Sequence, residues 1–264
     1  MQSTVDVCLY TFKSGSSILW LLVWVDDTII VDNDPELREK FVADLSQRFP
    51  IEDKHELSWI LGMKVTRDRK HHTLSMSQEL YVKDLLTRHA SLLDGLTKRF
   101  DSPCDPSITL SPEQCPASGS AEWARMQKHG ADYMALVGAF LWLANVSRPE
   151  LSYISSQLAR FVSNPGEVHY SAALRVLLYL KGSADRQLHY QPVASRPLRI
   201  FVDSDWGVKY SISGACFELM GCNVHWFAKT QRSVSLSSTE AECFAAIVWW
   251  PPAKAYSSEI FLPS

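Results

Sequence analysis

The sequence predicts an α+β protein, because stretches with the alternation of β-strands stand near both ends of the chain and a helical block lies between them. Near the start, the apolar runs of residues 18–25 and 29–31 lie on either side of a pair of aspartates, which is typical of two strands joined by a turn. Residues 122–190 carry helical spacing, and alternation returns from residue 198. Strands and helices that alternate in blocks favour an α+β class over a parallel α/β sheet.

The composition is that of a globular protein rather than a membrane or disulfide-rich one. The chain has 264 residues, 46% hydrophobic and 21% charged, which is enough to bury a core. The apolar run of residues 18–25 is far shorter than the roughly 18 residues that suggest a membrane span. The N-terminus lacks the pattern of a secretory signal, and six cysteines form no CxxC pair. We therefore expect an intracellular protein, in the cytoplasm or nucleus, that contacts no membrane.

The first block, to about residue 100, should contain two strands, a helix, a hairpin and a second helix. Asp34 is a candidate N-cap with Pro35 at the first helical position. The alternation in LSWILGMKV (57–65) and TLSMS (73–77), around a charged tip, predicts a hairpin of two strands. Helical spacing resumes in SQELYVKDLLTRH. The inward face of the first helix should comprise Leu37, Phe41, Val42, Leu45 and Phe49.

A proline- and serine-rich segment separates this block from the helical one. Residues 101–120 hold four prolines and five serines, which predicts a linker or a loop that follows the surface. Three helices should follow within residues 122–190, divided at Arg148-Pro149 and at Asn164-Pro165-Gly166. The third block should begin with the strand RIFVDSDW and end with a helix at STEAECFAAIVWW, residues 238–250.

Charge alone leaves nucleic-acid binding open. The net charge is −3, but residues 64–99 contain eight Lys or Arg against four Asp or Glu. A local surplus of positive charge can follow a phosphate backbone, and it is equally typical of an ordinary surface of mixed charge. The candidate contacts with nucleic acid are Lys64, Arg67, Arg69 and Lys70.

Asp26 and Asp27 should lie at the tip of the first pair of strands. Two like charges so close raise each other's pKa unless a cation compensates them, and Mg²⁺ suits a site with one or two carboxylates and substrate phosphates. The alternative is a solvated turn, because Asp favours turns through local hydrogen bonds. The doublet by itself does not decide between the two.

Several longer motifs resemble one family. The string WVDD resembles the YxDD turn of reverse transcriptases, and KHELSWILGMKV and LSMSQELYVKDLL are similar to segments that follow this turn in polyproteins of copia-type LTR retrotransposons. YMALVGAFLWLANVSRPELSYISSQLARFVSNPGEVHYSAALRVLLYLKGS resembles a later region of the same polyproteins, and WFAKTQRSVSLSSTEAE resembles the signature of their ribonuclease H domain. The motifs occur in the family's order along nearly the whole chain.

The resemblance implies an architecture of four parts. Residues 1–100 would be a partial reverse-transcriptase palm and thumb, 101–121 a linker, 122–190 a helical connection, and 198–264 an incomplete ribonuclease H-like α/β domain. The function implied is that of a fragment of an RNA-directed DNA polymerase. The alternative is a non-catalytic nucleic-acid-binding protein or a vestigial transposon-derived protein.

For the polymerase part, the resemblance implies nucleotidyl transfer with two Mg²⁺ ions. Asp26 and Asp27 match the catalytic, metal-binding carboxylates, and Trp24 stands where the family has a Tyr beside the primer end. The implied partners are an RNA template, an RNA–DNA hybrid, a deoxynucleoside triphosphate and other segments of the polyprotein. A third family Asp has no counterpart, since Asp6 matches a non-catalytic stretch. We therefore expect the isolated chain to lack polymerase activity.

For the ribonuclease H part, the resemblance implies a site that is also incomplete. Asp203 matches the first catalytic, metal-binding carboxylate, and Glu242 matches the one on the following helix, with Glu240 as the alternative in register. Two further family carboxylates have no counterpart, and the surroundings of Glu259 do not match either of them. The stretch between Asp205 and Ser213 is shorter than in the family, which puts the first hairpin in question. We expect Asp203 and Glu242 to be idle.

Overall fold

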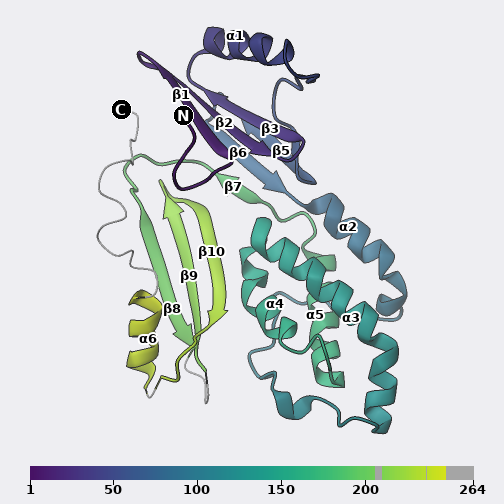
Figure 1. Ribbon diagram of the computed structural model, residues 1–264. Helices are drawn as coiled ribbons and strands as arrows, with labels where there is room; N and C mark the ends of the chain where they lie inside the picture. Colours follow the sequence, from purple (N-terminus) through teal and green to yellow (C-terminus); the bar gives the residue numbers. More distant parts are fainter. Residues whose placement is uncertain (206–209, 236, 248–264) are drawn as a thin grey trace. The chain divides into compact units, whose positions relative to one another are not determined.

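The computed structural model describes residues 1–205, 210–235 and 237–247 (Figure 1). The chain divides into two compact units, Met1–Val65 and Thr66–Ser264, with the boundary inside strand β5 (Met63–Asp68). The predicted mixture of strand-rich ends and a helical middle is confirmed. Each unit is described separately.

The first unit contains an antiparallel sheet in the order β1-β2-β3, with β2 at the centre. The strands are β1 (Leu9–Ser14), β2 (Ser17–Trp24) and β3 (Asp27–Asp32). The sequence predicted β2 and β3 but not β1. The turn between β1 and β2 carries Gly15 with φ of 60°, a conformation that glycine adopts without steric cost.

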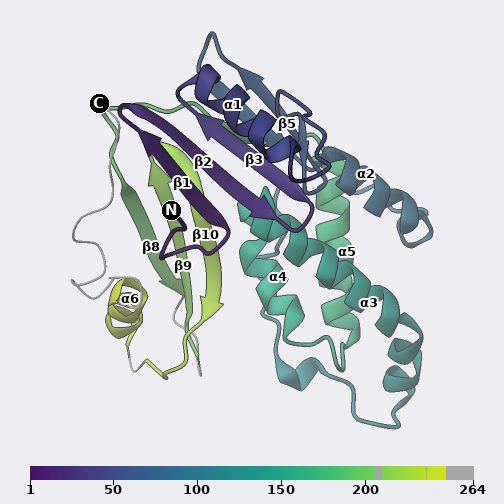
Figure 2. The same cartoon turned by 45° about the horizontal axis from the view of Figure 1, so that its top comes forward.

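Helix α1 (Pro35–Ser46) covers one face of this sheet (Figure 2). The predicted cap is confirmed, because the Asp34 side chain accepts hydrogen bonds from the backbone N–H groups of Glu36 and Leu37. Arg38 of α1 lies 3.6 Å from the carboxylate of Asp32, which is opposite Leu19 in the sheet. Leu19 is only 1% exposed, so this is the covered face.

Two predictions about this unit are wrong in detail. Phe49 lies beyond the end of α1 and is 57% exposed, because the helix stops at Ser46 before reaching the position predicted to face inward. The segment LSWILGMKV is not one strand but a tight hairpin of β4 (Trp59–Ile60) and β5. Leu61 and Gly62 form its two-residue turn with φ values of 49° and 75°.

In the second unit, the strand β6 (Thr73–Ser77) follows β5 after the charged turn and is its neighbour in the sheet. This confirms the hairpin predicted around that turn. The other neighbour of β6 is β7 (Leu188–Tyr190), which pairs with it antiparallel and places Leu74 opposite Tyr190. The sequence did not predict β7, whose partner is more than a hundred positions away.

The three helices predicted for residues 122–190 are confirmed. The first of them begins at Ala121, before the apolar stretch that starts near residue 133. Ser120 caps this helix, because its side chain accepts a hydrogen bond from the backbone N–H of Trp123. The helical elements of the second unit before β7 are α2 (Glu79–Arg88), η1 (Ala90–Leu93), η2 (Pro112–Gln114), α3 (Ala121–Val146), η3 (Pro149–Leu151), α4 (Ser152–Ala159) and α5 (Glu167–Gly182).

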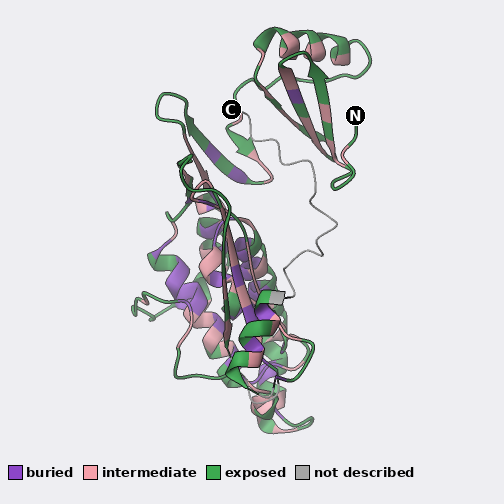
Figure 3. Cartoon of the chain, turned by 90° about the vertical axis from the view of Figure 1, so that its left-hand side faces the viewer, coloured by how far each residue is buried: buried purple, intermediate pink, exposed green. Residues whose placement is uncertain are grey.

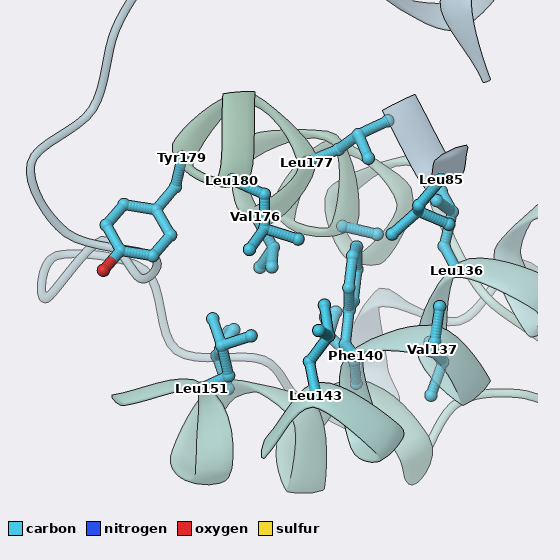
Figure 4. Close-up of a cluster of buried hydrophobic side chains, with 14 of the residues drawn as sticks. Leu85, Leu136, Val137, Phe140, Leu143, Leu151, Val176, Leu177, Tyr179 and Leu180 are labelled. Carbon is cyan, nitrogen blue, oxygen red and sulfur yellow. The ribbon is translucent and has the colours of Figure 1, made fainter. Parts of the chain in front are cut away.

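The main core lies among these helices, where buried residues are concentrated (Figure 3). Phe140 and Leu143 of α3 point toward Val176 and Leu180 of α5 (Figure 4). All four side chains are fully buried, and each contributes on the order of 2 kcal/mol through removal of apolar surface from water. Core side chains thus fix the mutual position of the helices.

The proline-rich segment follows the surface of the helical core. This matches the second of the two predictions for it, a loop that follows the surface. Leu110 is buried in the core, and the Asn164 side-chain amide donates a 3.1 Å hydrogen bond to the carbonyl of Pro116. Arg175 of α5 forms an ion pair with Asp105 at 3.2 Å. The linker is therefore attached at several points along its length.

The last part of the second unit is a sheet in the order β10-β9-β8 with helix α6 (Ser238–Ile247). Its strands are β8 (Arg199–Asp205), β9 (Ile212–Leu219) and β10 (Cys222–Thr230). β8 and β9 are paired as far as Asp205 opposite Ile212, so the questioned hairpin forms despite the short connection. The predicted extension of the helix through residues 248–250, and Glu259, lie outside the described residues.

Across the described part of the chain, no helix combines the length and apolar character needed to cross a membrane.

Candidate functional site

The Asp-Asp pair lies where β2 turns into β3. Trp24 and Asp27 are opposite each other in the last pair of the ladder, so the turn itself consists of Val25 and Asp26. Val25 has φ of 50°, a left-handed conformation that is costly for a β-branched residue. Asp26 is therefore in the turn, whereas Asp27 is the first residue of β3.

The face of the first-unit sheet opposite α1 carries exposed apolar side chains. Side chains alternate along a strand, so Trp20 and Trp24 share a face with Val31 and Asp27 through the register of β2 and β3. Trp20, Trp24 and Val31 are 40%, 55% and 50% exposed. The carboxylate of Asp27 thus lies at the end of an exposed aromatic surface.

Asp26 and Asp27 are both exposed, and neither makes a hydrogen bond or ion pair with another side chain within the described residues. Carboxylate oxygens at neighbouring positions suit a divalent cation such as Mg²⁺, which commonly takes one or two protein carboxylates and completes its shell with water or phosphate. Among the residues that the structure describes, no group of three His, Cys, Asp or Glu is placed to hold a metal. By their chemistry, the two carboxylates could supply part of the ligand set of a Mg²⁺ ion, and its other ligands would have to come from elsewhere.

The four candidate nucleic-acid contacts are exposed but do not form one surface. Alternation along β5 places Lys64 and Arg67 on opposite faces of the strand. Arg69 and Lys70 lie in the following turn, where Asp68 accepts hydrogen bonds from the backbone N–H of Lys70 and from the His71 ring. The hairpin tip thus carries positive charge together with a carboxylate.

The surplus of positive charge in residues 64–99 is partly neutralised by neighbouring carboxylates. In α2, Lys83 pairs with Glu79 at 2.6 Å and Arg88 pairs with Asp84 at 2.8 Å, each one helical turn apart. Such exposed pairs contribute only a few tenths of a kcal/mol to stability, but they reduce the net field of the helix. The candidate contacts Lys64, Arg67, Arg69 and Lys70 lie outside α2, in β5 and the turn after it.

Asp203 projects from one face of the β8–β10 sheet. In β8, Phe201, Asp203 and Asp205 point to one side, while Val202 and Ser204 point to the other. Asp203 is exposed and lies opposite Gly214. Asp203 and Glu242 could share a metal site only if α6 covered this same face of the sheet.

Helix α6 covers the side of Ser204. Ser204 is paired with Ser213, whose hydroxyl accepts a 2.9 Å hydrogen bond from the Gln231 side-chain amide. The same amide donates to the carbonyl of Ala241 in α6 at 2.9 Å. Because α6 covers the side of Ser204, the sheet lies between this helix and the face that carries Asp203. Glu242 is an exposed residue of α6. The structure does not place the two candidate carboxylates on a common face.

The face with Asp203 borders an open groove of about 410 Å³. Its opposite wall is formed by Glu150 and Tyr153 at η3 and the start of α4. Burial raises the pKa of the Tyr153 hydroxyl, and the negative charge of Asp205 raises it further. The acidic face of β8 therefore looks toward α4, not toward α6.

Sequence reasoning assigned no site residue to α3, yet this helix has an exposed ridge without charge. Met134 and Trp142 lie on it, together with Gly138, where an added Cβ would meet open space. These positions are spaced by four residues, which places them on one face of the helix. The sequence contains a sign of this ridge, because residues 133–147 include no charged side chain. The buried core residues of α3 lie on the other face of the helix.

Comparison with known proteins indicates the relatives of the chain. The retrovirus-related Pol polyprotein from transposon TNT 1-94 of Nicotiana tabacum is 33% identical over 253 residues, 93% of this chain and 18% of that protein. The corresponding polyprotein from transposon RE1 of Arabidopsis thaliana is 33% identical over 246 residues, 92% of this chain and 16% of that protein. An uncharacterized mitochondrial protein of Arabidopsis thaliana is 29% identical over 230 residues, 85% of this chain and 88% of that protein.

No model of a protein family and no solved structure matches the chain. The chain spans 16 to 18% of the length of the two transposon polyproteins that it matches. Identity of one third over more than nine tenths of the chain nevertheless shows common descent. The chain is homologous to the Pol polyproteins of copia-type retrotransposons.

Proposed function

We propose that the chain is the distal palm and thumb part of a retrotransposon RNA-directed DNA polymerase, joined to a ribonuclease H remnant. The observation that carries this proposal is the exposed pair Asp26 and Asp27 at the tip of an apolar hairpin. The pair makes no ion pair with another described side chain, and it stands at one end of a sheet face with exposed tryptophans. Homology to transposon Pol polyproteins supports the same assignment.

In this proposal, Asp26 and Asp27 would be ligands of Mg²⁺, which would stabilise the negative charge that develops on a triphosphate during nucleotidyl transfer. Trp24 shares its face with Asp27 and is half-exposed, so its ring is available to stack on a base or sugar at a primer end. The strained turn at Val25 holds the two carboxylates at the extreme tip of the hairpin. These residues position a nucleic-acid end, and other segments must supply the remaining ligands.

Asp203 and Glu242 do not fit a shared metal site in the same way, because the sheet lies between Asp203 and the helix that carries Glu242. No step of RNA cleavage is therefore derived from them. We assign this part to a ribonuclease H remnant that is catalytically idle in the isolated chain.

A primer-extension assay on an RNA template with Mg²⁺ tests the polymerase assignment. We expect no extension by the isolated chain above background, and extension when the chain is joined to the preceding segment of a transposon Pol polyprotein. In that fusion, Asp27→Asn should abolish extension, whereas Asp44→Asn, at an exposed position of α1, should not. Extension that survives Asp27→Asn would contradict the assignment.

Metal binding gives a readout that does not depend on activity. Mn²⁺ can replace Mg²⁺ as a paramagnetic probe, and it should broaden the NMR signals of Val25 and Thr28 in the isolated chain. Asp26→Asn combined with Asp27→Asn should remove this broadening, and Asp44→Asn should leave it intact. Equal broadening in all variants would show that the doublet is a solvated turn.

Nucleic acid is the proposed partner of the same chain, and its binding can be measured by titration with a labelled RNA–DNA hybrid. Affinity should fall with rising salt, and neutralising Lys64, Arg67, Arg69 and Lys70 should weaken it and flatten the salt dependence. A matched variant neutralises four other exposed cations: Lys40, Arg48, Lys54 and Lys229. An equal loss in both variants would indicate a general charge effect, and no binding at low salt would favour the vestigial alternative.

A further inference from the structure

His169, near the start of α5, is fully buried where the linker, α3, α4 and α5 meet. Its Nδ1 accepts a 2.9 Å hydrogen bond from the backbone N–H of Gly166, and its ring is stacked on Phe161 with 3.9 Å between centroids. Acceptance at Nδ1 requires that this nitrogen carries no proton. The structure therefore needs the neutral imidazole.

The turn that His169 closes is the one against which the linker rests. A Cβ added to Gly166 would lie 2.0 Å from the carbonyl oxygen of Gln114, the last residue of η2. On the other side of this contact, the Asn164 side-chain amide donates to the carbonyl of Pro116. Any opening of the turn at Gly166 must therefore disturb the packing of η2.

Protonation would remove the acceptor at Nδ1 and put a charge in a buried space. Nε2 is also buried, and it makes no hydrogen bond with a carboxylate among the described residues. The groups that favour a charged ring are the Ser111 backbone and, through its charge, Glu122. Five charged side chains lie close to this junction in the sequence: Glu113 on η2, Glu122 and Arg125 near the start of α3, Arg160 after α4, and Glu167 at the start of α5. Lys128 and Asp132 lie further along α3, and Arg175 and Lys181 lie further along α5.

The surroundings resist the charged form on balance. Burial is the main cause that lowers the pKa of His169 below the ordinary value of 6.5, and Arg160 lowers it further. The Ser111 backbone and Glu122 act in the opposite direction but do not reverse the shift. Arg125 is occupied by Glu167 at 2.7 Å.

We propose that His169 is an acid-sensitive latch that fastens the linker, through Gly166 and η2, to the start of α5. In the folded protein the ring stays neutral, whereas in the opened state it takes up a proton near its ordinary pKa. The latch is therefore closed above about pH 6.5, and its stability is lost progressively as the pH falls below that value. Opening releases residues around η2 from the helical core.

Hydrogen exchange of the full chain tests the latch. Between about pH 7.5 and about pH 5.5, protection of amides in residues 107–120 should fall measurably after correction for intrinsic rates, and linkage to one histidine limits this fall to about ten-fold. In His169→Asn, whose side-chain oxygen can still accept from Gly166 but does not titrate, protection should not change with pH. His129→Asn, at an exposed histidine of α3, should behave like the wild type. An equal pH-dependent loss in His169→Asn and the wild type, or no loss in the wild type, would overturn the proposal.

If His169→Asn does not fold, an NMR titration of the wild-type imidazoles replaces it. The resonance that shows a contact with Phe161 belongs to His169. It should titrate below the ordinary value of 6.5, together with the amide of Gly166. A titration of this ring at or above that value, with the Gly166 amide unaffected, would overturn the proposal.

Discussion

The indole Nε1 of Trp226 donates a 2.6 Å hydrogen bond to the backbone carbonyl of Ala144 and so joins β10 to the last turn of α3. The carbonyl is available because the backbone N–H groups of Ser147 and Arg148 both bond to Leu143. Trp226→Phe keeps an aromatic ring but leaves Ala144 without its donor. We expect a loss of about 1 to 2 kcal/mol in the free energy of unfolding, measured with urea. The control is Trp142→Phe on the exposed ridge of α3, which should change stability little.

Val25 is expected to destabilise the hairpin that carries the two aspartates. Its φ of 50° costs a β-branched residue on the order of 1 to 2 kcal/mol. Val25→Gly should therefore raise the stability of the first unit by about 1 kcal/mol, after allowance for the greater freedom of glycine in the unfolded chain. Val31→Gly, at a half-exposed position within β3, should lower it instead. Thermal unfolding of both variants measures the difference, and destabilisation by both would show that Val25 carries no strain.

Two glycines should respond in opposite ways to the same change. Gly166→Ala would place its Cβ 2.0 Å from the Gln114 carbonyl, so the backbone must shift at a cost of about 2 kcal/mol or more. Gly138→Ala lies within α3, where a Cβ meets open space, and should stabilise the chain by about 1 kcal/mol. Urea unfolding measures the free energy of unfolding of both variants. If Gly166→Ala left it unchanged, there would be no tight contact between η2 and the start of α5.

Asp34 should make the first unit sensitive to acid. Its pKa lies below the ordinary value of 3.8, mainly because the Ser17 hydroxyl donates to it at 2.6 Å, and also because the Leu37 and Glu36 N–H groups do. A lowered pKa in the folded state means that the ionised cap stabilises the fold above 3.8 and that this contribution is lost as the pH falls through the folded pKa. Circular dichroism of Asp34→Asn, which caps without ionising, should show a shallower acid transition than the wild type. Asp44→Asn, on the exposed side of α1, should retain the wild-type profile.

The accuracy of sequence reasoning followed the range of the interactions involved. The Asp34 cap and the three helices of the middle block were predicted because their signals lie within a few residues. The pairing of Leu74 with Tyr190 was not predicted, because nothing local specifies a partner so far along the chain. The split of LSWILGMKV was missed because its alternation obscured the turn at Gly62.

The candidate sites divide in the same way. The exposure of Asp26 and Asp27 follows from a hairpin that the local pattern specifies. The face from which Asp203 projects depends instead on which side of the sheet receives α6, and this is decided by packing after the chain has returned from β10. The sequence therefore identifies the candidate residues of a motif, but it does not predict whether residues on separate elements, such as Asp203 and Glu242, lie on the same face of the sheet.

The placement of Asp203 can be tested through its neighbour Asp205, which projects from the same face of β8. If that face looks toward α4, the carboxylate of Asp205 contributes to the raised pKa of Tyr153, second to burial. Asp205→Asn should lower the pKa of Tyr153, measured by tyrosinate absorbance as the difference between each protein and its Tyr153→Phe counterpart. Asp185→Asn, at an exposed position after α5, should leave it unchanged. A Tyr153 that titrates identically in both variants would mean that the acidic face of β8 is turned away from α4, and that Asp203 could then meet Glu242 after all.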